Sequence, residues 1–382
     1  MIFIIFSITL IYVLLIGRLS WGFDRITPFE LTDLKPKTRF TVIIPFRNEE
    51  KNLPYLLKSI ATLNYPNTYF QIIFVDDEST DHSHVRIQDY FNEHLQNLSN
   101  DAQFDIKILH NVRVTASPKK DAITLGISKA KYDWIVTTDA DSILPKYWLD
   151  AFDECIQKKD SNFIAAPVMY LQSNGFLKNF QHLDILSLQA ATIGSFGINK
   201  PFLCNGANLA YKKLLFIKVN GFQGNDDIAS GDDVFLLEKS TRLNALKVHY
   251  LKCKQAIVST KAVDSHSQLI EQRVRWAAKT SAYKNLFGKL SGFVILIQNA
   301  LLIFGLLLFT IGIVSGKELF YVFLIKIGCD FLLIYKSAVF FDQKKPLLFY
   351  IPAALYYPFF SVYVAFIAFF KGYHWKGRRY RH

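Results

Sequence analysis

The stretch FTVIIPFRNEEKNLPYLLKSIATLNYPNTYFQIIFVDD, residues 40–77, contains two short β-branched and aromatic runs on either side of a helical pattern. Residues 40–45 and 71–77 have the composition of buried strands, and apolar residues recur at helical spacing over 53–63. A strand, a helix and a strand in this order predict a right-handed crossover between two parallel strands.

The same alternation continues toward the C-terminus. Further strands are expected at 105–111 and 133–139, and helices at 84–95 and 121–130. The pattern predicts an α/β fold with a mostly parallel sheet that helices cover on both faces. The sequence contains no Gly-rich phosphate loop of either common type, which argues against a dinucleotide dehydrogenase and a P-loop kinase.

Polar residues gather where the predicted strands end. Asn48 and Glu49 follow the first strand, Asp76 and Asp77 end the second, and Asp139 with Asp141 ends the fourth. Ligands of open α/β sheets bind beyond the carboxyl ends of the strands. We therefore expect these clusters to share one rim of the sheet.

Both ends of the chain are apolar. Of 382 residues, 51% are hydrophobic and 20% are charged, and residues 1–17 carry no charge. The start lacks the basic residues and small-residue cleavage site of a signal peptide, so we predict an uncleaved transmembrane anchor. The first flanking charge, Arg18, lies on the C-terminal side, so the positive-inside bias predicts a cytoplasmic middle domain. With apolar segments at both ends, we expect a multi-pass protein of the cell (inner) membrane.

The net charge of +12 is compatible with nucleic acid, anionic lipid or phosphate-bearing ligands. The densest basic run is KGYHWKGRRYRH, residues 371–382, directly after an apolar segment, so we expect membrane lipids or phosphates and no nucleic acid. The cysteines are widely spaced and match no zinc pattern, as expected for reduced thiols in a cytosolic domain. They are Cys155, Cys204, Cys253 and Cys329.

Three apolar segments are predicted near 293–314, 319–341 and 346–370. The middle segment carries Lys326, Asp330 and Lys336, charges that are costly in lipid unless they are paired or face protein. Three full spans would place the basic tail outside the cell, against the positive-inside bias. We predict a cytoplasmic tail and a middle segment that does not simply span.

Seven motifs follow one another along the chain: PFRNEE (45–50), VDDEST (75–80), SPKKDAITLG (117–126), TTDADS (137–142), CNGANLAY (204–211), SGDDVFLLEK (230–239) and QRVRW (272–276). Their order resembles that of the membrane-bound family 2 glycosyltransferases, whose nucleotide-sugar-binding fold is called GT-A. A short stretch at 374–380, HWKGRRY, resembles the tail of ceramide glucosyltransferases and related bacterial enzymes.

The resemblance implies a division of the chain into five parts. They are an anchor at 1–20, a GT-A domain at 38–264, an interfacial amphipathic helix at 265–290, membrane segments at 291–371 and a basic tail at 372–382.

A divalent cation, Mg²⁺ or Mn²⁺, is the expected cofactor. It would bridge diphosphate oxygens to the carboxylates of Asp139 and Asp141 and neutralise the leaving group. The alternative for an isolated Asp-x-Asp is a chance occurrence in a turn or a helix cap.

Donor binding is expected at Asp76 or Asp77 and at Lys119, and Glu49 and Asp139 are expected on the donor side as well. Asp76 or Asp77 resembles the family's nucleotide-base contact, because a carboxylate can accept the uracil imide N–H; the alternative is a helix cap. The sequence does not show which of the two aspartates makes this contact. Lys119 matches a family lysine for the diphosphate or nucleotide, although a solvated basic loop is also compatible with the pattern.

The expected catalytic base is Asp233. Inversion requires a base that deprotonates the acceptor hydroxyl, and the family places it at the second acid of a pair that begins a helix. Asp232 stands where the family has Glu. A helix cap without catalysis uses the same geometry, and Asp226 and Asp227 are nearby rivals.

Gln272, Arg275 and Trp276 match the family motif that faces the acceptor channel and the departing diphosphate. At spacing i, i+3 and i+4 they share one face of a helix, and an amphipathic juxtamembrane helix is the compatible alternative. Asn205, Gly206 and Asn208 are expected to position an acceptor hydroxyl. The apolar stretch 180–196 is either a membrane-surface helix or a buried one.

Together these features predict an inverting glycosyltransferase that moves a sugar from a nucleotide-diphosphate donor, with UDP favoured, to a lipid or glycan hydroxyl at the cytoplasmic membrane face. A processive polysaccharide synthase is the alternative of the same class, although the few apolar segments leave little material for a translocation channel. A non-catalytic membrane scaffold on the same fold is the alternative of another class.

Overall fold

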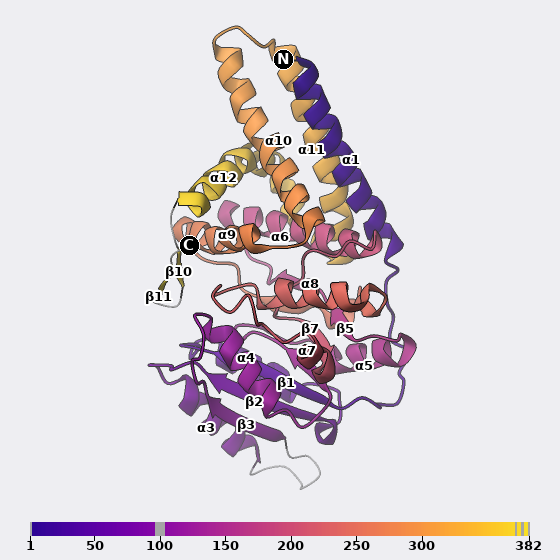
Figure 1. Cartoon of the computed structure of the whole chain (residues 1–382), viewed down its shortest axis with the longest axis vertical. Coiled ribbons are helices and arrows are strands. Elements are labelled where there is room, and N and C mark those ends of the chain that lie inside the picture. Colours follow the sequence, from indigo (N-terminus) through magenta and orange to yellow (C-terminus); the bar gives the residue numbers. More distant parts are fainter. Residues whose placement is uncertain (1, 96–103, 371–372, 376–377, 381–382) are drawn as a thin grey trace. The chain divides into compact units, whose positions relative to one another are not determined.

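The computed structural model describes residues 2–95, 104–370, 373–375 and 378–380 (Figure 1). The chain divides into two compact units. The α/β unit comprises Thr27–Leu171 and Cys204–Lys261, and the helical unit comprises Met1–Ile26, Gln172–Leu203 and Ala262–His382. The α/β unit is thus discontinuous, because residues 172–203 fold with the terminal segments.

The α/β unit is built on a seven-stranded sheet, counted over the described residues, in the order β3-β2-β1-β4-β7-β5-β8. Strands β1 to β4 are mutually parallel where they pair, whereas β7 is antiparallel to both β4 and β5. A second sheet pairs β6 with β9. The strands are β1 (Phe40–Phe46), β2 (Phe70–Asp76), β3 (Asp105–His110), β4 (Trp134–Thr137), β5 (Phe163–Ala165), β6 (Val168–Tyr170), β7 (Leu209–Lys212), β8 (Val248–Tyr250) and β9 (Val258–Thr260).

Helices cover both faces of the sheet, so the predicted α/β architecture is confirmed. Alternate residues of β1, including Phe40 and Val42, belong to a core with α2, α3 and α5. On the other face Ile43 meets α4 so closely that a Cβ at Gly126 would lie 2.7 Å from its side chain. The helices of this unit are α2 (Leu53–Ala61), α3 (Ser83–Leu95), α4 (Pro118–Ser128), α5 (Trp148–Lys158), α7 (Lys213–Lys218) and α8 (Asp232–Asn244), with 3-10 turns η1 (Asn67–Tyr69), η3 (Ala245–Lys247) and η4 (Lys254–Ala256).

The helical unit is built around α6, which is buried over most of its length. Helix α1 packs backbone to backbone against it, since a Cβ at Gly194 would lie 2.2 Å from the Leu19 carbonyl oxygen. The structure therefore favours the buried reading of residues 180–196. The elements are α1 (Ile2–Arg25), α6 (Phe176–Gly197), α9 (His266–Ala278), η5 (Lys279–Ala282), α10 (Leu286–Thr310), α11 (Gly316–Phe340), η6 (Lys345–Phe349), α12 (Tyr350–Phe370), β10 (Tyr373–Trp375) and β11 (Arg378–Tyr380).

Three helices of the described residues are long and apolar enough to cross a membrane: Phe3–Arg25, Leu286–Thr310 and Lys345–Phe370. Helix α11 is not among them because of its charges, and these charges are paired. Lys326 lies 2.7 Å from Asp330, and Lys336 lies 2.5 Å from Asp24 of α1. Pairing of this kind removes much of the cost of placing charges in an apolar bundle.

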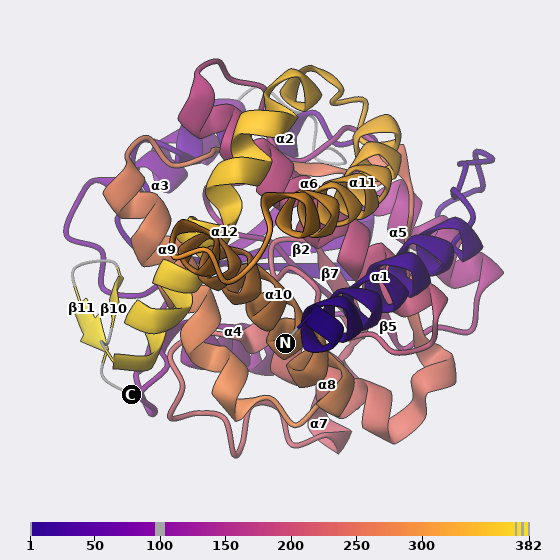
Figure 2. The ribbon, with the colours of Figure 1, turned by 90° about the horizontal axis from the view of Figure 1, so that it is seen from above.

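The long helices of this unit differ in composition and also in direction. In Figure 1, α1, α10 and α11 run steeply upward, whereas α12 lies nearly level, and Figure 2, seen from above, shows α12 extended across the view. The prediction singled out the middle segment, which is α11. By composition α11 falls outside the candidate spans, as that prediction expects, and by direction α12 differs from the other long helices of this unit.

The basic tail lies partly outside the described residues. Residues 371–372, 376–377 and 381–382 are not described, and Tyr373–Trp375 pairs with Arg378–Tyr380 in an antiparallel ladder.

Candidate active site

The centre of the candidate site is an ionic cluster at the end of β4. The Lys119 ammonium lies 2.7 Å from Asp139 Oδ1 and 3.4 Å from Asp232 Oδ2. Burial alone lowers the pKa of Lys119, but the carboxylates of Asp139 and Asp232 outweigh burial and hold the pKa above its ordinary value. Lys119 is therefore a charged, structured side chain, and the reading of a solvated basic loop is wrong.

Asp233 is held by two backbone amides. The Gly206 N–H donates to Oδ2 at 3.1 Å, and the Val234 N–H donates to Oδ1 at 2.7 Å. Asp232 and Asp233 occupy the first turn of α8, as predicted, where the helix dipole favours negative charge. The amides fix the direction of the Asp233 carboxylate, and Lys119 pairs with its neighbour Asp232.

Gly206 approaches this cluster too closely for a side chain. A Cβ at Gly206 would lie 2.9 Å from Asp232 Oδ2 and 3.4 Å from Lys119 Nζ. Thr137 at the end of β4 anchors the segment through a hydrogen bond to the Gly206 carbonyl oxygen at 2.9 Å. The glycine lets the backbone pass next to both carboxylates.

We expect Gly206→Ala to lower the rate of sugar transfer by about 10- to 100-fold, since displacing a positioned group by about 1 Å costs up to this much. The added methyl group must shift Asp232 or Lys119. Initial rates and thermal melting of the purified variant measure the effect. A wild-type rate with a wild-type melting temperature would show that the position of this cluster does not matter for transfer.

Lys120 is a positioning residue that the sequence did not reveal. Its buried ammonium donates to the carbonyl oxygens of Asn225 at 2.5 Å and Ile228 at 2.7 Å, and it lies 4.9 Å from the Phe235 ring centre. It thus ties α4 to the segment that precedes α8. The motif alone does not show that Lys119 pairs with the site carboxylates whereas Lys120 binds backbone carbonyl oxygens.

The Asp-x-Asp pair suits a hard cation. Both candidate ligands are carboxylates, and Mg²⁺ or Mn²⁺ is commonly held by one or two carboxylates together with substrate phosphates. Asp139 is 35% exposed and uses only Oδ1 toward Lys119, while Asp141 Oδ2 accepts from Thr260 at 3.3 Å. These residues fit such a cation, and their metal role stays a prediction.

The two aspartates at the end of β2 have different surroundings. Asp77 Oδ1 accepts from Asn111 at 2.9 Å and from Arg113 at 3.0 Å. Asp76 accepts the Ser79 N–H at Oδ1, and its Oδ2 lies 4.0 Å from His110 Nδ1. The side chain of Asp77 is thus committed to structural partners to a greater degree than that of Asp76.

Glu49 lies in the turn before α2, beside the segment that follows β2. Its backbone N–H donates to Ser83 at 2.8 Å, and its Oε2 accepts from Asn52 at 2.7 Å. The contact with Ser83 links the segment that follows β1 to the segment that follows β2, as the shared rim predicts.

Asn205 and Asn208 have separate roles. Asn208 is fully buried, accepts from the Trp148 indole at 2.8 Å and donates to two backbone carbonyls, of Pro167 and Ala256. The expectation that Asn208 positions an acceptor is therefore wrong, because its amide is occupied within the fold. Asn205 is half-buried and caps its own turn through the Ala207 N–H.

Gln272, Arg275 and Trp276 lie on α9, in the helical unit, and all three are half-buried. The buried arginine is Arg273, which the motif does not single out: its Nε donates to Asp184 of α6 at 2.6 Å, and Nη1 donates to Gln272 at 2.8 Å. Its guanidinium lies 4.1 Å from the Trp276 ring centre. Arg273 therefore orients two of the three motif residues.

The chain is similar to known proteins over part of its length. Residues 41–216 match the family model described as glycosyl transferase family 2. This segment, somewhat less than half of the chain, resembles a family 2 glycosyltransferase domain. It contains the Asp139 and Lys119 cluster and the end of β2, and α8 follows it in the chain.

Several curated proteins are similar to the chain, and YdaM and TarS are two of them. The "probable glycosyltransferase YdaM" of Bacillus subtilis is 25% identical over 284 residues, 71% of this chain and 64% of that protein. The poly(ribitol-phosphate) beta-N-acetylglucosaminyltransferase TarS of Staphylococcus aureus is 22% identical over 231 residues, 60% of this chain and 36% of that protein. The chain thus spans less than two thirds of either relative.

A solved structure shares the fold. The mannosyltransferase PcManGT of Pyrobaculum calidifontis, in complex with GDP-Man and Mn²⁺, has a TM-score of 0.58 at 16% identity and covers 93% of this chain and 99% of its own. This likeness agrees with the GT-A fold.

Proposed function

We propose that the chain is an inverting glycosyltransferase that moves a sugar from a UDP-linked donor to a hydroxyl of a lipid or glycan. The observation that carries the proposal is the cluster in which Lys119 joins Asp139 to Asp232 beside the amide-held carboxylate of Asp233. A cationic side chain and a candidate base beside one another support the proposal, and the segment that contains Lys119 and Asp139 matches the family 2 model. TarS, by its name, glycosylates a polymer, and PcManGT was solved with a nucleotide sugar.

In this mechanism Asp233 removes the proton of the acceptor hydroxyl as the oxygen attacks the anomeric carbon. The bond from that carbon to the diphosphate oxygen breaks on the opposite face, which inverts the configuration. Lys119 contributes positive charge beside the departing diphosphate. A divalent cation bound by Asp139 and Asp141 would supply Lewis-acid charge to the same leaving group.

Donor recognition is assigned to the rim formed by Glu49, Asp76 and Asp77. Asp76 is the better base contact, because Asp77 already accepts from Asn111 and Arg113. Gln272, Arg275, Trp276 and Asn205 are assigned to the acceptor and the departing diphosphate.

Incubation of membranes that contain the chain with a panel of labelled nucleotide sugars tests the proposal. Labelled product in the lipid or glycan fraction, dependent on the chain, is expected from one donor of the panel. A single added sugar separates this activity from a processive synthase. Donor binding without transfer or hydrolysis would favour a non-catalytic scaffold.

We further propose that the α/β unit faces the cytoplasm at the cell membrane and that α12 lies at the membrane surface. A reporter fused after His382 is then expected to read cytoplasmic. Basic residues concentrate there, and the positive-inside bias applies to them: Lys371, Lys376, Arg378, Arg379 and Arg381. Paired reporters, one active only in the cytoplasm and one only outside, measure the side. An external signal would instead require α12 to span.

A further inference from the structure

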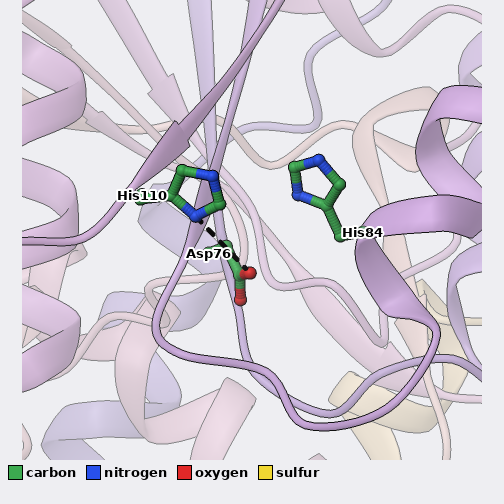
Figure 3. A group of neighbouring side chains, drawn as sticks. All are labelled: Asp76, His84 and His110. Carbon is green, nitrogen blue, oxygen red and sulfur yellow. Dashed lines mark ion pairs between the residues drawn. The ribbon is translucent and has the colours of Figure 1, made fainter.

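A group of potential metal ligands lies at the β2 end of the rim, apart from the Asp-x-Asp pair. Asp76 ends β2 and His110 ends β3, where the two residues are partners in the parallel ladder. His84 comes from the first turn of α3. Figure 3 shows the two imidazoles side by side with the Asp76 carboxylate between and below them. One ligand atom from each residue lies within 4.8 Å of the others.

The hydrogen bonding of this group is incomplete. His84 Nδ1 is buried and has no hydrogen-bond partner among the described residues. His110 Nδ1 lies 4.0 Å from Asp76 Oδ2, too far for a hydrogen bond. The two rings are stacked, with centres 5.3 Å apart and an angle of 7°. A buried ring nitrogen without a partner costs free energy, and a ligand would remove that cost.

The donor set indicates which cation would bind. Two imidazoles and one carboxylate suit borderline transition metals such as Zn²⁺, whereas the oxygen-only pair Asp139 and Asp141 suits Mg²⁺ or Mn²⁺. We propose that Asp76, His84 and His110 form a Zn²⁺ site with an open fourth position.

The site needs only a small contraction. Zn–N and Zn–O bonds of about 2.0–2.2 Å place tetrahedral ligand atoms roughly 3.4 Å apart, against the 4.8 Å limit of the group. The His110 side chain is 78% exposed and can rotate toward Asp76. Its exposure also leaves room for water or a substrate group at the fourth position.

Zn²⁺ bound at this site would weaken binding of the nucleotide-sugar donor. This effect rests on the proposed function, in which Asp76 contacts the nucleotide base. Asp76 Oδ2 can then bind either the base or Zn²⁺, but not both at once. Zn²⁺ at this site therefore lowers donor affinity, and the two histidines make the effect specific to imidazole-seeking metals.

Zinc binding by the full chain in detergent, without a polyhistidine tag and without nucleotide sugar or Mn²⁺, tests the site directly. Competition with a chromophoric zinc chelator is expected to show one tight Zn²⁺ per chain. His84→Ala and His110→Ala each remove a ligand and should weaken binding by at least about 100-fold, since even an outer-shell change costs 10- to 100-fold. His82→Ala is the matched control, because His82 is exposed and lies two residues before His84.

The His110 side chain is exposed, so we expect His110→Ala to fold. The proposal is overturned if this variant binds zinc with unchanged affinity. Equal loss in His82→Ala would do the same by showing adventitious surface binding. Melting curves without zinc identify any variant that fails to fold. A second titration measures donor affinity with and without Zn²⁺. If zinc binds at these residues but donor affinity is unaffected, the metal site stands and the donor role of Asp76 fails.

Discussion

Asp233→Asn is expected to lower the turnover number for sugar transfer by about 10²- to 10⁴-fold, the usual scale for removing a positioned base. Asparagine retains the size of aspartate and can still accept from the Gly206 amide, but it cannot take a proton from the acceptor. Nucleotide-sugar affinity should therefore stay near the wild-type value, because the lost interaction acts in the transition state. Turnover from initial rates and donor affinity from equilibrium titration give the two numbers.

Asp232→Asn is the matched comparison. Asp232 pairs with Lys119 at 3.4 Å and begins the same helix, so its loss should lower turnover less and disturb the lysine more. If the two variants exchange ranks, Asp232 is the base. If donor affinity in Asp233→Asn falls as far as turnover, Asp233 is a donor contact and the base must be sought at Asp226 or Asp227.

Removal of divalent cations is expected to abolish transfer, and Mn²⁺ or Mg²⁺ should restore it. A leaving diphosphate carries charge that Lys119 alone, already shared between Asp139 and Asp232, does not neutralise. The measurement is the initial rate in excess chelator and after back-titration with each metal. Full activity in excess chelator would rule out the metal role of Asp139 and Asp141.

Asp139→Ala makes this prediction specific to the site. It should weaken donor binding as well as turnover, whereas Asp160→Ala, an exposed carboxylate paired with Lys247 elsewhere on the α/β unit, should change neither. A metal requirement that survives in Asp139→Ala with wild-type affinity would place the cation at another group of ligands.

The first half of the fold could be predicted from sequence because its signals are local. The apolar runs of β1 and β2 and the helical period of α2 each lie within one short window, and the observed bounds agree within two residues. The order of β5, β7 and β8 could not be predicted. Those strands are three or four residues long, and their partners are set by packing between distant segments.

The candidate site could be predicted as far as its residues follow strand ends or helix starts. Asp139 and Asp233 do so, and the structure adds that Lys119 pairs with both Asp139 and Asp232. The role of Lys120 was not visible, since a buried lysine differs from an exposed one only through its tertiary partners.

Two further features depended on contacts distant in sequence. Arg273 is distinguished only by its contact with Asp184 of α6, 89 residues away. The histidine group was missed because its ligands come from three elements with no motif spacing: Asp76, His84 and His110.

The configuration of the product tests the central claim most directly. With the donor identified from the panel, nuclear magnetic resonance of the freshly formed product gives the anomeric configuration of the transferred sugar. Direct displacement assisted by Asp233 predicts a configuration opposite to that of the donor. Retention of the donor configuration, or the absence of transfer from every donor tested, would contradict the account.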